Sequence, residues 1–223
     1  MPQNETRDTK ERILDAAERL FADRGFAATS MRNITAEADV NLAAANYHFG
    51  SKEMLIQAVF ARRLLPINRE RIERLDELES ARADAGPTAA QIVEAFIGPP
   101  LRMSRDRERG GPVFCRLLGH AMNQPKDQIR ELLANQFQEV LHRFIAAVQR
   151  IRPDLPEHEI PWRLLFIAGA MAHTMAMADE VMRLYGTSNR TSDAEEMIAK
   201  LVPFLAAGLS SPAVTAGVDG TGT

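Results

Sequence analysis

Polar side chains with complementary hydrogen-bonding chemistry cluster between residues 41 and 52 of this 223-residue chain. The amide of Asn46 carries a donor and an acceptor, the pair that matches adenine in the major groove of DNA. Tyr47 and His48 follow with a hydroxyl and a ring N–H, which suit phosphate oxygens. Lys52 comes soon after, where its ammonium and the amides of a helix N-terminus would form an anion site. These residue types at this spacing indicate contact with double-stranded DNA.

The sequence around these residues predicts two short helices joined by a tight turn. Ser30 can cap the first helix, whose apolar face includes Ile34. Asp39 tolerates a left-handed turn, and Asn41 is a good cap for a second helix over residues 42–48. This order is that of a helix-turn-helix, whose second helix enters the DNA major groove.

Small residues on the second helix would allow a close approach to DNA. Ala43, Ala44 and Ala45 leave room for the backbone near base edges, and a methyl group can contact the methyl of thymine. Taken singly, each position also fits a plain packing module, with Tyr47 in a core and His48 as an ordinary surface histidine. Their occurrence together in this order favours DNA binding over that alternative.

Residues 9–55 resemble the N-terminal domain of TetR-family transcriptional regulators, and the run YHFGSKE is a specific mark of that family. The matching positions are Ile13, Ala16, Ala17, Phe21, Gly25, Phe26, Thr29, Ile34, Ala38, Val40, Tyr47, His48, Phe49, Ser51 and Lys52. The resemblance implies DNA contacts from Asn41, Ala43, Ala44, Asn46, Tyr47, His48 and Lys52, with Arg32 as a contact to the DNA backbone. Asp39 and Ala43 stand where the family usually has glycine, which bears on sequence preference and leaves the fold intact.

The composition favours a folded, cytoplasmic protein. Hydrophobic residues make up 45% and charged residues 26%, which permits a sizeable core, and the start of the chain is too polar for a signal peptide. The net charge of -3 gives no overall basic footprint, so a DNA-binding protein of this charge must present its cations locally. The single cysteine, Cys115, lies in an apolar run, which favours a buried and inert thiol.

The sequence predicts neither an enzyme nor a bound cofactor. The histidines show no paired metal spacing, and no glycine-rich phosphate loop follows a strand. We therefore expect no catalytic residue and no metal site.

Helical periodicity runs through the chain and no segment alternates like a strand, so we expect an all-α fold. Residues 1–62 would form the helix-turn-helix DNA-binding domain, and residues 63–209 a larger helical domain for ligand binding and dimerisation. The helix at their boundary should end or kink at Pro66. Residues 210–223 lack a periodic face and should be disordered. Residues 162–178 are strongly apolar but short for a bilayer span, so we expect a helix buried in protein and no membrane partner.

Two C-terminal helices carry faces that suit a homodimer. Small residues at Ala168, Ala172 and Ala176 would let two helices approach closely. The last helix carries a wide apolar stripe that includes Ile198, Leu201 and Leu205. Such helices from two chains would make a four-helix seam, and a two-fold dimer would place two recognition helices on a palindromic operator. The alternative is that both helices merely complete the core of one chain.

Large, soft apolar side chains of the second domain suggest a cavity for an apolar small-molecule effector. The candidates are Phe96, Phe114, Leu117, Met122, Phe137, Leu141, Trp162, Phe166, Met171 and Met175. Arg116 lies in an apolar run and could pair with a ligand carboxylate. An ordinary packed core, with Arg116 on a solvated helix face, explains the same pattern.

Patches across most of the chain resemble the PsrA subgroup of the TetR family. They are VNLAAANYHFGSKE, FCRLLGHA, PWRLLFIAGA and LVPFLAAG. The resemblance implies a bacterial repressor that responds to long-chain fatty acids, and thus an apolar-chain ligand with a carboxylate head, which it does not locate in this sequence. We expect the effector to be such an acid or its acyl thioester. The alternatives are a TetR-like repressor that responds to a drug or aromatic compound, and a ligand-independent DNA-binding or interaction protein. A buried acidic residue in the cavity would favour a cationic drug, whereas an inward arginine would favour an acid.

Overall fold

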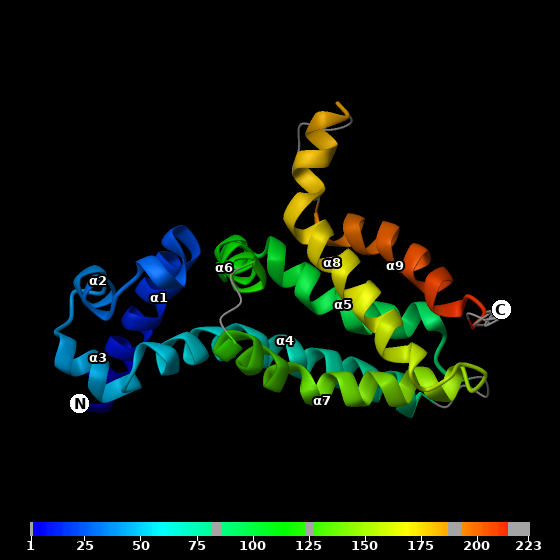
Figure 1. Ribbon diagram of the computed structural model, residues 1–223, viewed down its shortest axis with the longest axis horizontal. Coiled ribbons are helices and arrows are strands. Elements are labelled where there is room, and N and C mark those ends of the chain that lie inside the picture. The colour runs from blue at the N-terminus through cyan, green and yellow to red at the C-terminus, as the bar shows by residue number, and fades with distance from the viewer. Residues whose placement is uncertain (1, 82–85, 124–126, 187–192, 214–223) are drawn as a thin grey trace, which may run out of the picture.

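The computed structural model describes residues 2–81, 86–123, 127–186 and 193–213, and within these ranges the side chains of residues 2–7, 122, 123, 127–130, 132 and 133 are excepted. This part of the chain is helical without strands, so the predicted all-α fold is confirmed. The helices are α1 (Pro2–Ala28), α2 (Met31–Glu37), α3 (Leu42–Phe49), α4 (Lys52–Ser80), α5 (Ala89–Arg105), α6 (Gly111–Asn123), α7 (Asp127–Ile151), α8 (Glu159–Leu184) and α9 (Ala194–Ser210). Figure 1 shows α1, α2 and α3 at one end of an elongated molecule, with α4 leading from them to the larger helical domain.

The helix caps predicted in the N-terminal domain are present. The side chains of Ser30, Asn41 and Ser51 accept hydrogen bonds from backbone amides in the first turns of α2, α3 and α4. Each cap satisfies an amide that the helix itself leaves unpaired. Asp39 adopts the left-handed conformation expected of it, with a φ of 52°. Local sequence therefore fixes the helix-turn-helix.

The core of the N-terminal domain continues into the C-terminal domain. Phe21 and Phe60 are fully buried, and the ring of Phe26 lies between them at centroid distances of 5.3 and 6.1 Å. Phe114 of α6 then packs edge-on against Phe60, with centroids 6.3 Å apart. This shared core makes α6 a second contact between the domains, in addition to α4.

Helix α4 continues through Pro66, so of the predicted end or kink at this residue the end is wrong. Proline removes one intrahelical hydrogen bond and disfavours a helix interior. Here Leu64 and Ile67 on either side of it are buried, and Leu75 further along is fully buried. Tertiary burial of this face outweighs the local cost of Pro66, and one rigid element serves both domains.

Helix α5 is the centre of the C-terminal core. Its buried residues include Ile92, Val93, Ile97 and Leu101, and it packs on α4, α6, α7, α8 and α9. A capping box at Thr88 fixes its start. Phe96 of α5 meets Phe144 of α7 edge-on, with ring centroids 5.0 Å apart.

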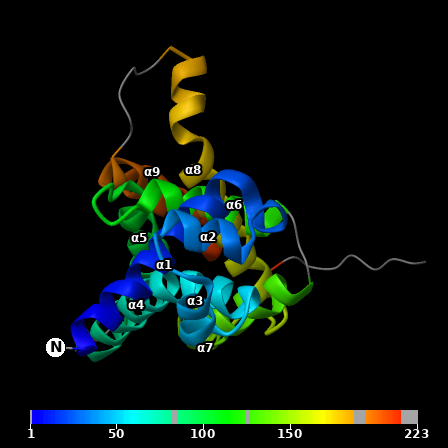
Figure 2. The ribbon, with the colours of Figure 1, turned by 90° about the vertical axis from the view of Figure 1, so that its left-hand side faces the viewer.

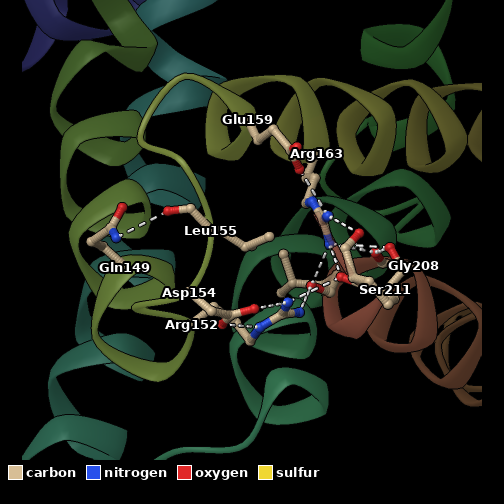
Figure 3. A network of polar contacts seen from close by, with 10 residues as sticks. Gln149, Arg152, Asp154, Leu155, Glu159, Arg163, Gly208 and Ser211 are labelled. Carbon is tan, nitrogen blue, oxygen red and sulfur yellow. Dashed lines mark hydrogen bonds and ion pairs between the residues drawn. The ribbon is translucent and has the colours of Figure 1, made fainter. Parts of the chain in front are cut away.

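A network of arginine contacts holds the end of α9 (Figure 3). Nη1 of Arg163 donates to the carbonyls of Leu209 and Ser211, at 2.9 and 2.8 Å. Nη1 of Arg152 also donates to the carbonyl of Leu209, at 2.9 Å. The tail was predicted to be disordered from residue 210, but α9 includes Ser210 and these contacts hold the residue after it. Residues 214–223 lie outside the described residues, where the prediction stays untested.

Candidate DNA-binding surface and ligand cavity

The outer face of α3 presents the polar side chains predicted to contact DNA. Asn46 is exposed and Tyr47 is 83% exposed, whereas Ala45 and Phe49 on the opposite face are buried. The alternative with Tyr47 in a core is therefore wrong. His48 is half-buried, its ring 5.3 Å from that of Tyr47. In Figure 2, α2 and α3 face the viewer at the end of the molecule.

The remaining predicted DNA contacts differ in how free their side chains are. Ala43 and Arg32 are exposed, and Ala44 is half-buried. The amide oxygen of Asn41 accepts the N–H of Ala44 at 2.8 Å, which commits that oxygen to the cap.

Lys52 lies at the start of α4 as predicted, but its ammonium is engaged within the chain. It donates a hydrogen bond to the backbone carbonyl of Phe26, near the end of α1. An ammonium carries three N–H donors, and this bond uses one of them.

A further residue that the sequence analysis did not identify orients this surface. Nη2 of Arg12, on α1, donates to the carbonyls of Ala38 and Asp39, at 2.6 and 2.8 Å. These carbonyls lie in the turn between α2 and α3, where a cation also suits the negative end of the α2 dipole. Arg12 is far from the turn in sequence, so no local pattern could reveal the contact.

The C-terminal domain encloses an apolar cavity of about 530 Å³ between α4, α5, α6, α7 and α8. Such a volume is within the usual range of about 300–1,000 Å³ for small-molecule sites. Six of the predicted ligand residues line it: Phe96, Phe114, Phe137, Leu141, Met171 and Met175. Leu141 is 38% exposed, which places it where the cavity meets solvent.

Four other predicted ligand residues are placed elsewhere. Trp162 and Phe166 are 59% and 64% exposed on the outside of α8, and Leu117 is buried in the core shared with the N-terminal domain. Arg116 points outward, with Nη2 3.3 Å from a carboxylate oxygen of Asp23 on α1. The prediction that it faces a ligand is wrong, because its turn of α6 packs on α1. The side chain of Met122 lies outside the described residues.

The charged residue that lines the cavity is instead Arg71 of α4. Its side chain is buried, with 3% of the residue exposed. Nε donates to the carbonyl of Phe96 at 2.7 Å, and Nη1 donates to the amide oxygen of Asn68 at 3.1 Å. Burial lowers the pKa of the Arg71 guanidinium to about 9, so the group stays charged at neutral pH. Arg71 lies in a run of charged residues that is typical of a solvated helix face, so the sequence did not indicate its burial.

Most of the predicted dimer residues are used within one chain. Ala168 and Ala172 line the cavity, and Ile198 and Leu205 are 5% and 6% exposed in the core. Leu201 is half-buried and Ala176 is exposed. The assignment of Ile198 and Leu205 to a surface contact is therefore wrong, because α9 turns these residues inward against α5. Ala168 and Ala172 are half-buried, and their dimer role stays a prediction.

An ion-pair cluster connects α4 to the N-terminal domain between the two candidate sites. The carboxylate of Glu18, on α1, is 3% exposed and accepts hydrogen bonds from Arg62 and Arg63 of α4. Arg62 also donates to Asp15 at 2.7 Å. Because a buried charge that loses its partner is costly, this cluster holds α1 against α4.

Helix α8 does not behave as the buried helix that the sequence predicted. Among the described residues, α8 is the helix that is long and apolar enough to span a membrane. One such helix is weak evidence for a membrane protein, because helices of non-membrane proteins can meet the same criteria. Little of its apolar window is buried within the chain, and Figure 1 shows its C-terminal end projecting beyond the other helices. Arg163, inside the helix, is buried against α9.

A helix-turn-helix before the start of α4 and an apolar cavity lined by the middle of the same helix define the class of two-domain helical regulators. Residues 13–59 match the family described as bacterial regulatory proteins, tetR family, and residues 94–208 match a tetracyclin repressor-like C-terminal domain. The second match alone covers more than half of the chain. The chain belongs to the TetR family, which is not a family of enzymes.

Curated relatives match over a short region. The HTH-type transcriptional repressor Rv3405c of Mycobacterium tuberculosis is 53% identical over 47 residues, 21% of this chain and 25% of that protein. The regulator UidR of Escherichia coli is 40% identical over 57 residues, 26% of this chain and 29% of that protein. The matched region is thus between a quarter and a third of the relatives' length.

Solved structures match over nearly the whole chain. The fatty acid degradation regulator FadR of Bacillus halodurans has a TM-score of 0.67 at 13% identity, covering 91% of this chain and 96% of that one. FadR of Bacillus subtilis in complex with stearoyl-CoA has a TM-score of 0.66 at 14% identity, covering 89% and 98%. SmeT in complex with triclosan has a TM-score of 0.64 at 20% identity, covering 92% and 95%. At these identities the likeness establishes the fold alone.

Proposed function

We propose that this protein is a homodimeric, sequence-specific DNA-binding repressor in the cytoplasm, released from a palindromic operator by an apolar small molecule. The observation that carries this proposal is that one helix, α4, begins three residues after α3 ends and lines the cavity further along. Lys52 and Arg71 are separated by 19 residues of this helix, or about 28 Å. A ligand that shifts α4 would therefore move α3.

The proposed coupling follows the contacts between the domains. A tilt of α4 would pull on Glu18 through Arg62 and Arg63, while Phe114 connects the cavity wall to the N-terminal core. A 100-fold loss of operator affinity requires about 2.7 kcal/mol of coupling, within the usual allosteric range. The ligand must favour the state that does not bind DNA, since equal affinity for both states shifts nothing.

The proposed dimer uses the exposed apolar residues of α8 and α9. Trp162 and Phe166 of α8 contact each other with ring centroids 6.1 Å apart, and Phe204 of α9 is 74% exposed. Aromatic residues are enriched in the buried centres of interfaces. We expect Phe166→Glu to give monomers in sedimentation, whereas Leu65→Glu, at an exposed leucine of α4, should remain dimeric. A dimeric Phe166→Glu protein would refute this placement.

We propose an effector with a long alkyl chain, a fatty acid or its acyl thioester, as the PsrA-like patches imply. The cavity lining is apolar except for Arg71 and Ser104, and no acidic side chain lines it among the described residues. The cationic-drug alternative thus loses the partner that it would need. A neutral aromatic compound is the second candidate, favoured by the aromatic rings of the lining and by the triclosan bound to SmeT.

The test begins with selection of bound DNA from a random pool, which should yield an inverted repeat. Saturated fatty acids of increasing length are then titrated against the operator complex, with triclosan as the aromatic probe. Each buried methylene contributes about 0.8 kcal/mol, so neighbouring chain lengths should differ strongly in potency. If no chain length releases DNA while triclosan does, the fatty-acyl effector is wrong and the aromatic one replaces it.

A further inference from the structure

The guanidinium of Arg71 is a buried cation without a counterion among the described residues. Its oxygen partners are the carbonyl of Phe96 and the amide oxygen of Asn68, both uncharged. Its further polar contact among the described residues is weak, from Nη2 to the sulfur of Met171 at 3.8 Å. Removing a charge from water costs free energy unless the charge is paired. An anion bound beside the guanidinium of Arg71 would therefore be stabilising.

Arg71 contacts a backbone carbonyl of α5 that lacks its usual donor within the helix. The carbonyl of Phe96 would normally accept the N–H of the residue four positions later, but that residue is Pro100, which has none. Nε of Arg71 supplies the missing donor at 2.7 Å. Satisfying one carbonyl requires only one neutral N–H, so this role alone does not explain a guanidinium with five donors.

The surroundings hold the guanidinium in place while leaving Nη2 beside the cavity. Asn68 accepts from Nη1 and donates its own amide N–H to the carbonyl of Gln136 on α7, at 2.7 Å. The guanidinium carbon lies 4.5 Å from the centre of the Phe96 ring and 5.9 Å from that of Phe137. Contacts with α5, α7 and α8 thus fix the cation, and the polar contact of its Nη2 among the described residues is with the thioether of Met171.

We infer that Arg71 is the head-group anchor of the cavity and that the effector is an unesterified monocarboxylic acid with an apolar tail. This inference rests on the proposed function and narrows it from fatty acid or thioester to the free acid. A carboxylate at Nη2 would replace the sulfur contact with a charge-assisted hydrogen bond and neutralise the buried cation. In an acyl thioester a neutral thioester group takes the place of the carboxylate, so it would leave the guanidinium of Arg71 without a counterion.

The inference also explains how the ligand reaches α4. Arg71 belongs to α4, whereas Phe96, Phe137 and Met171 belong to three other helices. A carboxylate that displaces the thioether of Met171 would change the packing of α8 against α4 at the charged centre. The head group, and not only the tail, would therefore contribute to release from DNA.

The test compares decanoic acid, 1-decanol, decyltrimethylammonium and decanoyl-CoA by calorimetry with the full chain. We expect the wild-type protein to bind the acid at least about 10-fold more tightly than the alcohol, since hydrogen bonds to charged groups are stronger than neutral ones. Arg71→Gln, which keeps an N–H donor for Phe96, should bring the two affinities to within about threefold. Arg69→Gln removes an exposed arginine of the same helix and should keep the preference.

The alcohol guards against a folding defect in Arg71→Gln. Its affinity should stay at the wild-type value in this variant, whereas the affinity for the acid should fall. A wild-type protein that binds acid and alcohol equally, or prefers decanoyl-CoA, would overturn the inference and leave the apolar effector standing. Failure of every probe to bind would overturn both the inference and the fatty-acyl effector of the proposed function.

Discussion

The outer face of α3 and the cavity are built in opposite ways. On α3 the polar side chains of Asn46 and Tyr47 stand in water, and neighbours in sequence supply their support, such as the cap at Asn41. In the cavity one buried cation, Arg71, is held by residues from three other helices. The first site can be dissected by single substitutions, whereas a change in the second disturbs several helices at once.

The largest expected effect is from filling the cavity, which should abolish the response to the effector while leaving DNA binding by α3 nearly unchanged. Ala172 lines the cavity, and Ala172→Phe should occupy space needed by the tail and abolish a release of about 100-fold. Operator affinity without effector should stay within about threefold of wild type, because overpacking costs typically about 1–3 kcal/mol of stability rather than DNA contacts. Fluorescence anisotropy with labelled operator measures both. Ala146→Phe, at an exposed alanine of α7, is the matched control.

The converse substitution on α3 should affect DNA binding alone. Asn46→Ala should cost about 1–3 kcal/mol on the preferred operator if the side chain contacts an adenine. Binding to random DNA and to decanoic acid should be unchanged. Gln138→Ala removes an exposed amide from α7 and should have no effect on either. Equal losses on operator and random DNA would contradict base recognition by Asn46.

The orientation of the α3 surface depends on one residue that is distant in sequence, Arg12 of α1, and a third substitution tests this dependence. Arg12→Ala removes two hydrogen bonds to turn carbonyls, each from a charged donor. We expect a loss of about 1–3 kcal/mol in the free energy of unfolding, measured by urea denaturation. The loss in operator affinity should exceed that of Arg19→Ala, which breaks an exposed ion pair with Glu37 on α2. Equal losses would mean that Arg12 does not orient the turn.

The smallest effect is expected at Cys115, whose thiol lies between the two regions on α6. Burial raises the pKa of Cys115 to about 11, more than the nearby Arg105 and Arg116 lower it. Because the thiolate is the reactive form, about one thiol in a thousand is ionised at pH 8. Alkylation by iodoacetamide at pH 8 should be roughly 100-fold slower than in the urea-unfolded chain, and its rate should rise tenfold per pH unit up to about pH 10. A fast reaction at pH 8 would contradict the burial of this thiol.

The two exposed aromatic residues of α8 show where sequence reasoning misjudged which face of a helix is buried. Trp162 and Phe166 were predicted for the ligand and Ala172 for the dimer, but in the structure Ala172 lines the cavity and the aromatic pair faces outward. Both faces of α8 are apolar, so periodicity could not tell which one is buried in its own chain. Only the position of α5 and α9 against the helix decides this.

The sequence by itself determined whatever depends on neighbouring residues. Caps at Ser30, Asn41 and Ser51 and the left-handed Asp39 specify the helix-turn-helix, because capping and turn formation act over a few positions. The tertiary structure alone decided which arginine enters the cavity. Arg116 lies in an apolar run yet pairs with Asp23, whereas Arg71 lies in a charged run yet is buried. Burial of a charge is set by the helices packed around it, and Phe96, Phe137 and Met171 reach Arg71 from distant parts of the chain.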